Sequence, residues 1–271
     1  MRTSFYWCDV PLAKASTILG LSNQRNDGSI LLYPGGMARG EVDIPHSLRE
    51  GTPTAHIRSG WARLGGNAVG IRRAPVGGRD RIMVTIMNWA PYGMVVRAGD
   101  NLIALANAGY MSSAHLADVI HLHAGITILR AKQHLLPQSD IHHRNGWEMI
   151  PCLDPHIYTL PQIVEEVPWT GGWFKRNQFL VISAAEQPHI PKGHTGRLRW
   201  LVPGTVHSTA LLDHEDSCGK RAFEILISAK RVLVEPGMHV ADLYIYATPG
   251  SAPRPGVYRN RASIVPINPE W

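Results

Sequence analysis

The sequence has few cysteines and no long apolar run. Cys8, Cys152 and Cys218 lie far apart and form no C-x-x-C pair, so we expect neither a disulfide framework nor a cysteine-rich zinc site. No stretch approaches the roughly 18 apolar residues that a membrane-spanning helix needs, and the first residues have no apolar core of signal-peptide length. We therefore expect a soluble, cytoplasmic protein with no membrane partner.

The signature of zinc-dependent nucleobase deaminases is also missing. It consists of His-x-Glu followed by Pro-Cys-x-x-Cys, but Pro151-Cys152 has no partner cysteine. A cupin-like metal site would need a nearby glutamate and a matching glycine pattern, which the sequence lacks. We therefore interpret the histidines of one crowded region as scattered surface residues and expect no protein-bound metal. These histidines are His115, His121, His123, His134, His142 and His143.

The composition is that of a folded β-rich protein. Of the 271 residues 44% are hydrophobic and 18% charged, which is typical of a globular chain. The 26 glycines and 20 prolines, without heptad patterns, favour many short strands joined by turns. The net charge of +6 suits an anionic partner such as nucleotide phosphate or nucleic acid, or simply an ordinary basic protein.

Eight tryptophans in a basic chain would suit stacking on single-stranded nucleic acid. Five of them lie in or beside strand patterns, so core packing is the preferred interpretation and a nucleic-acid partner is not expected. These five are Trp61, Trp89, Trp147, Trp173 and Trp200.

Short apolar runs bounded by Gly, Pro and Asn predict strands along most of the chain. We also expect a weak helix over Val10–Leu21 and a short helix from Ser112 or Ser113 through Ile120. The stretch Gly109–Thr170 shows no regular period. The predicted strands are Ser29–Tyr33, Arg81–Asn88, Met94–Arg97, Asn101–Ala108, Gln178–Ala185, Arg197–Val202, Ala222–Ala229, Arg231–Glu235 and His239–Thr248.

The two β-rich halves resemble each other. The segment from Glu41 to Pro45 has a counterpart from Glu186 to Pro191, and both contain a glutamate followed by Ile-Pro. Val96–Leu105 aligns with Val234–Leu243, each with a strand that ends at a glycine turn and a second apolar strand. We interpret the halves as two copies of one β unit.

Two motifs lie far apart in the chain, Arg58-Ser-Gly-Trp-Ala-Arg63-Leu-Gly65 and Val206-His207-Ser-Thr209-Ala210. They resemble the phosphate-binding motif and the Val-His-x-Thr-Ala turn of the dCTP deaminase branch of the dUTPase-like superfamily. Phe223-Glu224-Ile225 resembles the strand with the catalytic glutamate. Asp213 falls near an Ile-Asp-Pro-Gly position, Pro236-Gly237-Met238 matches a Pro-Gly-Met turn, and Val257-Tyr258-Arg259-Asn260 resembles the segment that covers the nucleotide.

The resemblance implies a mostly β protein of two tandem dUTPase-like distorted β-barrel (jelly-roll-like) domains, over residues 1–110 and 111–271. The first half keeps the phosphate motif but has Thr85 where the glutamate would lie. The second half keeps the catalytic motif but has only Gly196-Arg197-Leu198-Arg199-Trp200 in place of the phosphate motif. Because active sites in this superfamily lie between subunits, we hypothesise one composite site between the two halves. Decay of both sites is the alternative.

The implied reaction is hydrolytic deamination of dCTP, or a related deoxycytidine nucleotide, to dUTP and ammonia without zinc. A carboxylate next to the attacking water can accept its proton. Glu224 lies in an apolar strand pattern, where burial would raise the pKa of a carboxyl group and suit it to this role; a strand glutamate that faces water is the alternative. The predicted nucleobase ligands are His207, Thr209 and Ala210, and the predicted phosphate ligands are Arg58, Ser59, Arg63, Arg197 and Tyr258.

Two other functions stay open. Asp213 could act as the catalytic aspartate of a dUTP pyrophosphatase, although the Tyr-Arg-Gly expected after it is absent and a solvated turn is the plainer interpretation. A catalytically silent β module in an oligomeric or structural assembly is the third possibility. The resemblance also implies a deoxynucleoside triphosphate partner, Mg²⁺ carried by its phosphates, and a homo-oligomer.

Overall fold

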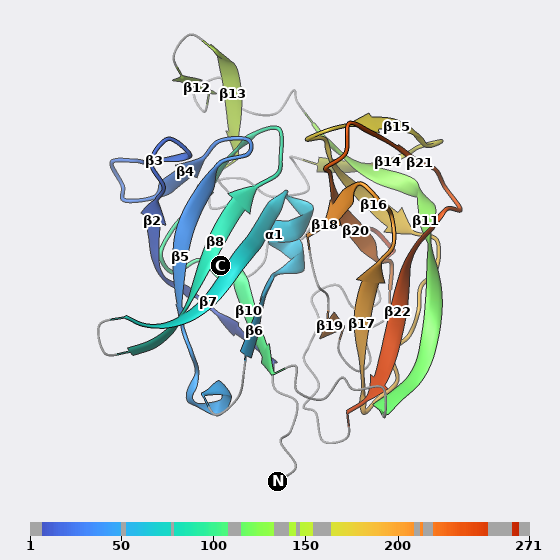
Figure 1. Cartoon of the computed structure of the whole chain (residues 1–271). Coiled ribbons are helices and arrows are strands. Elements are labelled where there is room, and N and C mark those ends of the chain that lie inside the picture. Colours follow the sequence, from blue (N-terminus) through green and yellow to red (C-terminus); the bar gives the residue numbers. More distant parts are fainter. Residues whose placement is uncertain are drawn as a thin grey trace.

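The computed structural model describes residues 7–49, 53–76, 79–107, 115–132, 141–144, 147–153, 164–208, 212–213, 219–248 and 262–265. Within these ranges the chain is mostly β-strand, with one short α-helix, α1 (Ser59–Arg63), and one 3-10 turn, η1 (His46–Leu48). The predicted mostly β fold is confirmed. Two β-rich halves lie side by side with α1 between them (Figure 1). No helix in the described ranges is long and apolar enough to span a membrane.

The first half contains a four-stranded sheet in the order β2-β5-β8-β7 and a three-stranded sheet in the order β1-β10-β6. Strand β9 pairs with β4, and β4 with β3. Their apolar faces enclose one core, which includes Leu12, Ile82 and Leu105. The strands are β1 (Trp7–Val10), β2 (Leu12–Thr17), β3 (Ser22–Gln24), β4 (Ile30–Leu32), β5 (Met37–Asp43), β6 (Pro53–Ile57), β7 (Gly66–Val76), β8 (Arg79–Asn88), β9 (Gly93–Val96) and β10 (Ile103–Asn107).

The second half is built on a larger sheet, in the order β18-β20-β16-β11-β22-β17-β19, with β14 also paired to β11; β15 and β21 form a separate pair. Its core includes Leu122, Phe223 and Leu243. The strands are β11 (Leu116–Ala131), β14 (Val164–Pro168), β15 (Gly172–Lys175), β16 (Phe179–Ala184), β17 (His194–Trp200), β18 (Thr205–His207), β19 (Leu212–Asp213), β20 (Ala222–Ile227), β21 (Arg231–Val234) and β22 (His239–Ala247).

The long strand β11 bends this second sheet into a nearly closed, barrel-like shape (Figure 1). Its first part pairs with β22, and its later part pairs with β16 and β14. The register shifts within β11 mark the irregularities where the strand changes partner. A single strand therefore takes part in both faces of the barrel.

A helix was predicted at the start of each half, and both predictions are wrong. Val10–Leu21 contains the end of β1 and all of β2, whose residues pair with β5 from Leu12↔Val42 to Thr17↔Ala38. In the second predicted helix, residues 112–114 lie outside the described residues, and residues 116–120 begin β11, which pairs with β22. Helix preference differs by only a few tenths of a kcal/mol per residue among ordinary residues, so pairing with distant strands decides the local structure.

The segment that follows the predicted boundary at residue 110 is more regular than its sequence indicates. It contains β11, β12 (Ile141–Arg144) and β13 (Trp147–Leu153). Strand β13 runs parallel to β9 of the first half, with Cys152 opposite Gly93. A division at residue 110 therefore leaves one hairpin of the second segment paired to the first half.

The strand orders of the two halves correspond. The path β2-β5-β8-β7 has the same order as β11-β16-β20-β18, β1-β10-β6 the same as β11-β22-β17, and β4-β9 the same as β15-β21. The glycine turns that align in sequence also have the same geometry, since Gly99 and Gly237 adopt φ +95° and +81°. Their N–H groups donate to the carbonyls of Leu12 and Ala124, at 2.8 and 2.7 Å.

The tryptophans divide between core and surface. Trp61 and Trp89 are buried in or beside the first core, as predicted. Trp173 is 55% exposed, so core packing is wrong for this residue, and the guanidinium of Arg231 lies 4.4 Å from its ring centroid. A cation over the ring face stabilises an exposed aromatic side chain. Trp200 is half-buried.

Candidate active site

The short helix α1 places Arg63 at the junction between the halves. It begins directly after Arg58, whose backbone is still extended, and Gly60, Trp61, Ala62 and Arg63 are all buried. The turn after the helix requires Gly65, which has φ +93° and would bring a β-carbon to 2.7 Å from that of Ala90. The helix lies against β20 of the second half, so its last residue faces the other half of the chain.

Glu224 occupies the middle of β20 and is only 2% exposed. The interpretation of this residue as a strand glutamate facing water is therefore wrong. Its backbone is fixed on both sides: it lies opposite Val181 of β16, and its carbonyl accepts a hydrogen bond of 2.8 Å from the N–H of Ser208. A buried carboxylate is costly unless it has charged or hydrogen-bonding partners.

The two carboxylate oxygens of Glu224 meet side chains from both halves. Nε of Arg63 lies 3.5 Å from Oε1, and Nε2 of His207 lies 3.9 Å from Oε2. All three side chains are buried, with exposures of 6%, 5% and 2% for Arg63, His207 and Glu224. The first half thus supplies the guanidinium, and the second half supplies the carboxylate and the imidazole.

Aromatic packing holds His207 in this position. Its ring stacks on Trp200 at 5.1 Å between centroids, with a 25° angle between planes, and meets Phe223 edge-on at 6.3 Å. The indole N–H of Trp200 donates to the Thr205 hydroxyl at 2.6 Å. A ring fixed between two aromatic side chains has little freedom to rotate, which favours one orientation toward Glu224.

A second buried arginine lies near Arg63. Arg221 lies just before β20, and burial together with the nearby positive charge of Arg63 lowers its pKa to about 10. It keeps its proton at neutral pH, so two guanidinium groups lie near each other in this part of the described structure. Guanidinium groups suit an anionic ligand.

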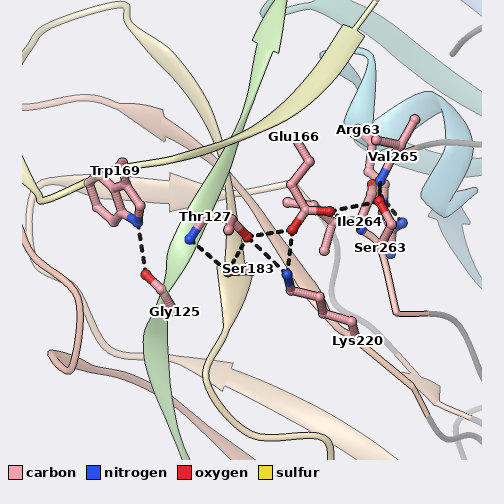
Figure 2. A network of polar contacts seen from close by, with 10 residues as sticks. All are labelled: Arg63, Gly125, Thr127, Glu166, Trp169, Ser183, Lys220, Ser263, Ile264 and Val265. Atoms are coloured by element: carbon pink, nitrogen blue, oxygen red, sulfur yellow. Dashed lines mark hydrogen bonds and ion pairs between the residues drawn. The ribbon is translucent and has the colours of Figure 1, made fainter.

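Residues 263–265, near the end of the chain, lie next to Arg63. The Nη1 group of Arg63 donates to the carbonyl of Ile264 at 2.9 Å. The N–H of Ile264 and the hydroxyl of Ser263 donate to the carboxylate of Glu166 at 3.1 and 2.6 Å. Figure 2 shows this carboxylate between that segment and the ammonium group of Lys220.

Glu166 is held as an anion. Burial by itself would raise its pKa, but hydrogen bonds from Lys220, Ser263, Thr127 and the N–H of Ile264 lower the pKa of Glu166 to about 2. The charged network therefore fixes the position of the Ile264 carbonyl that Arg63 contacts.

The other predicted phosphate ligands lie apart from this group in the described contacts. Arg58 points toward the first half, with Nε 3.5 Å from Oδ1 of Asp9 and Nη1 donating to the Asn101 carbonyl at 3.2 Å. Ser59 is half-buried at the start of α1. Arg197 is exposed on β17, between Leu212 and Tyr244.

Some predicted residues cannot be placed. Thr209, Ala210 and Tyr258 lie outside the described residues. Asp213 is described only through its backbone, which pairs with Gly196 at the end of the large sheet. The predicted roles of these four residues stay predictions.

Sequence reasoning missed two members of the group. Trp200 was considered only as a core residue, and Arg221 was not considered at all. The basic pair Lys220-Arg221 lies next to the strand that contains Glu224, and this pattern could have indicated Arg221.

Comparison with known proteins gives the fold class. The sequence matches no protein-family model, and no curated protein matches it significantly. Solved structures show that the fold is dCTP deaminase-like. A 2'-deoxycytidine 5'-triphosphate deaminase from Agrobacterium tumefaciens is similar over 89% of this chain and 89% of that chain, with a TM-score of 0.60 and 13% sequence identity. At this identity the similarity establishes a common fold.

Proposed function

We propose that the protein is a hydrolytic deaminase of dCTP or a closely related deoxycytidine nucleotide. The proposal rests on one observation: the side chains of Arg63, Glu224 and His207 lie together in one buried group. The fold shared with a dCTP deaminase supports the same reaction class. The guanidinium groups of Arg63 and Arg221 suit a triphosphate-bearing substrate.

In the proposed reaction, water adds to C4 of cytosine and Glu224 accepts the proton that the water loses. The proton then passes to the exocyclic amino group, the C4–N bond breaks, and ammonia leaves with a uracil product. Arg63 next to Oε1 favours the ionised carboxylate that this step needs, whereas burial alone opposes it. We assign Arg63 to holding the base ionised, in addition to its predicted role toward phosphate.

We further propose that the chain arose as two tandem copies of one β domain, with a single composite site. The matching strand orders and glycine-turn hydrogen bonds support the duplication. The composite site is supported by its parts, since α1 belongs to the first half and β18 and β20 to the second. Mg²⁺ bound through the nucleotide phosphates, and assembly into a homo-oligomer, are part of the proposal.

The direct test is incubation of the purified protein with Mg²⁺ and either dCTP or dUTP, with ammonia and pyrophosphate measured as products. Ammonia from dCTP supports the deaminase, and pyrophosphate from dUTP alone would favour the pyrophosphatase based on Asp213. Glu224→Gln should reduce ammonia release by about 10²-fold or more, because a general base contributes roughly 10²–10⁴ in rate.

Glu235→Gln is the matched control, because it makes the same chemical change at an exposed turn residue before β22. It should leave the rate unchanged. If Glu224→Gln and Glu235→Gln release ammonia equally fast, the assignment of the base is wrong.

A catalytically silent module is the second candidate, and one observation favours it. Glu224 is 2% exposed and lies between two possible cations, which is also the geometry of a buried ion pair that joins two halves. Neither product from either nucleotide, with the fold intact, would support this candidate.

A further inference from the structure

A cluster of histidine and carboxylate side chains lies on β11 and β22, which are not the elements that form the candidate active site. Nδ1 of His121 and Nε2 of His239 lie 2.7 and 2.8 Å from the same oxygen, Oδ1 of Asp242. All three candidate ligand atoms lie within 4.8 Å of one another. The sequence interpretation of scattered surface histidines does not describe His121, because it converges with residues more than a hundred positions away.

A β-bulge creates this convergence. Residues three apart on a regular strand point to opposite faces of the sheet, yet His239 and Asp242 share a face. The register between β11 and β22 passes from Leu122↔Ala241 to His123↔His239, which leaves Val240 as an extra residue. Val240 and Ala241 both point into the core, and the bulge turns His239 to the side that carries Asp242.

We propose that His121, His239 and Asp242 form a binding site for a divalent transition-metal ion of the Zn²⁺ class. Two imidazoles and one carboxylate are a common zinc ligand set, and they leave a fourth position for water. The two imidazole rings lie 5.0 Å apart at 79°. A tetrahedral ion with Zn–N bonds of about 2.0–2.1 Å would hold two rings at roughly this separation.

The ion would replace the two hydrogen bonds to Asp242. Each imidazole would then bind through the nitrogen that now faces Oδ1 and carry its proton on the other ring nitrogen. Side-chain exposures of 65% for His121 and 39% for His239 leave the position open to solvent, and the 13% exposure of Asp242 shields its carboxylate. The ion would join strand β11 to strand β22.

A neighbouring pair supports the ligands from the side. His123 lies opposite His239 with ring centroids 5.4 Å apart, and its Nδ1 contacts Oε1 of Glu186 at 2.6 Å. The N–H of His123 also donates to the same carboxylate at 2.8 Å. Glu186 thus fixes the middle of β11 beside the proposed site and adds negative charge near it. The sequence shows no glutamate next to His123, because Glu186 is distant in the chain and close only in the fold.

The test is titration of the full-length chain, without a histidine tag, with Zn²⁺ by calorimetry, and in parallel with Mg²⁺. We expect one Zn²⁺ per chain, a higher melting temperature with Zn²⁺ because the ion binds the folded state, and no such rise with Mg²⁺. His121→Gln, His239→Gln and Asp242→Asn should each weaken Zn²⁺ binding by at least about tenfold.

His194→Gln is the matched control, since it removes a half-buried histidine at the start of β17 in the same sheet and leaves the cluster intact. It should bind Zn²⁺ like the unaltered protein. The proposal is overturned if the unaltered chain binds no Zn²⁺, or if the three ligand variants bind it as tightly as His194→Gln. Should a variant fail to fold, the visible spectrum of the unaltered protein with Co²⁺ decides, because a site with imidazole ligands must give new d–d bands.

Discussion

The two halves differ in the connection from β6 to β7 and the corresponding connection from β17 to β18. In the first half the connection from β6 to β7 contains α1, which carries Arg63 toward the second half. In the second half the connection from β17 to β18 is a tight turn, residues 201–204, and contains no helix. Similar frames thus hold different connections, and only the connection with the helix delivers a guanidinium across the junction.

The strands that follow these connections also differ, and here the second half carries the residues of the candidate site. Strand β20 carries the buried Glu224, and β18 carries His207. Asn88 and Ile227 close corresponding turns, bonded to Gly35-Gly36 and Asn177-Gln178 respectively. This equivalence puts Thr85 at the place of Glu224 in the first half, as the motif comparison predicted. The two halves thus share a strand order, while the residues of the candidate site are divided between them.

The largest expected effect comes from breaking the contact between the halves. Arg63→Ala leaves Glu224 buried without its guanidinium partner, and removal of one partner of a buried ion pair costs about 3–5 kcal/mol. The free energy of unfolding, measured by urea titration, should fall by this amount. Ammonia release from dCTP should fall as well, because the carboxylate loses the charge that keeps it ionised.

Arg58→Ala is the comparison variant for stability. Arg58 faces Asp9, which is 30% exposed, at 3.5 Å, and pairs with exposed members contribute only about 0–1 kcal/mol. Equal losses of unfolding free energy for Arg63→Ala and Arg58→Ala would show that the contact across the junction has no special weight.

Smaller effects are expected from Gly→Ala changes at corresponding turns, which test whether the backbones of the two halves are equivalent. Gly65 and Gly204 have positive φ, and a β-carbon on either would lie 2.7 Å from that of Ala90 or Ala229. Each Gly→Ala change should cost about 1–3 kcal/mol for the backbone conformation, and a further amount for the clash. Urea unfolding of both variants should give similar losses.

Gly99→Ala and Gly237→Ala provide the matched controls for the clash. Both glycines have positive φ, but no atom lies within 4 Å of an added β-carbon. They should lose only the backbone contribution, again by similar amounts in the two halves. Strongly different losses within either pair would contradict the equivalence of these turns.

The smallest effect concerns the network that holds the C-terminal segment against Arg63. Because hydrogen bonds lower the pKa of Glu166 to about 2 from an ordinary value of 4.5, the folded state favours the carboxylate. The resulting stability is present above about pH 4.5 and is lost as the pH falls toward 2. Unfolding by urea between pH 5 and 2 should therefore show a steeper loss in the unaltered chain than in Glu166→Gln. Parallel pH profiles for the two proteins would contradict the assignment.

Much of the fold was accessible from local patterns. The strands β8, β16, β20, β21 and β22 follow apolar runs bounded by turn residues, and these runs predicted them to within a few residues. The predicted helices failed at Val10–Leu21 and before Ile120, where weak helical periodicity competes with pairing to distant strands. Strand β11 was missed because its residues serve two faces of the barrel, so no single period describes them.

The residues of the candidate site, like the strands, were only partly predictable from the sequence. Motif order pointed to Arg63, His207 and Glu224, although it gave Arg63 a phosphate role and did not pair it with the glutamate. Ser263 and Ile264 carried no recognisable motif, because their contribution depends on where the chain returns in space. The cluster of His121, His239 and Asp242 depends on a bulge, and a one-residue register shift has no reliable signature in a single sequence.

The sequence by itself determined the β-rich fold class, the glycine turns at Gly99 and Gly237, and the residue types that a deaminase would use. These depend on local preferences, on apolar periodicity and on positive φ, which neighbouring residues set. Only the tertiary structure decided that the guanidinium of Arg63 meets the carboxylate of Glu224, 161 positions away. A buried charge needs a partner at a few ångströms, and strand pairing rather than chain order decides which residue that partner is.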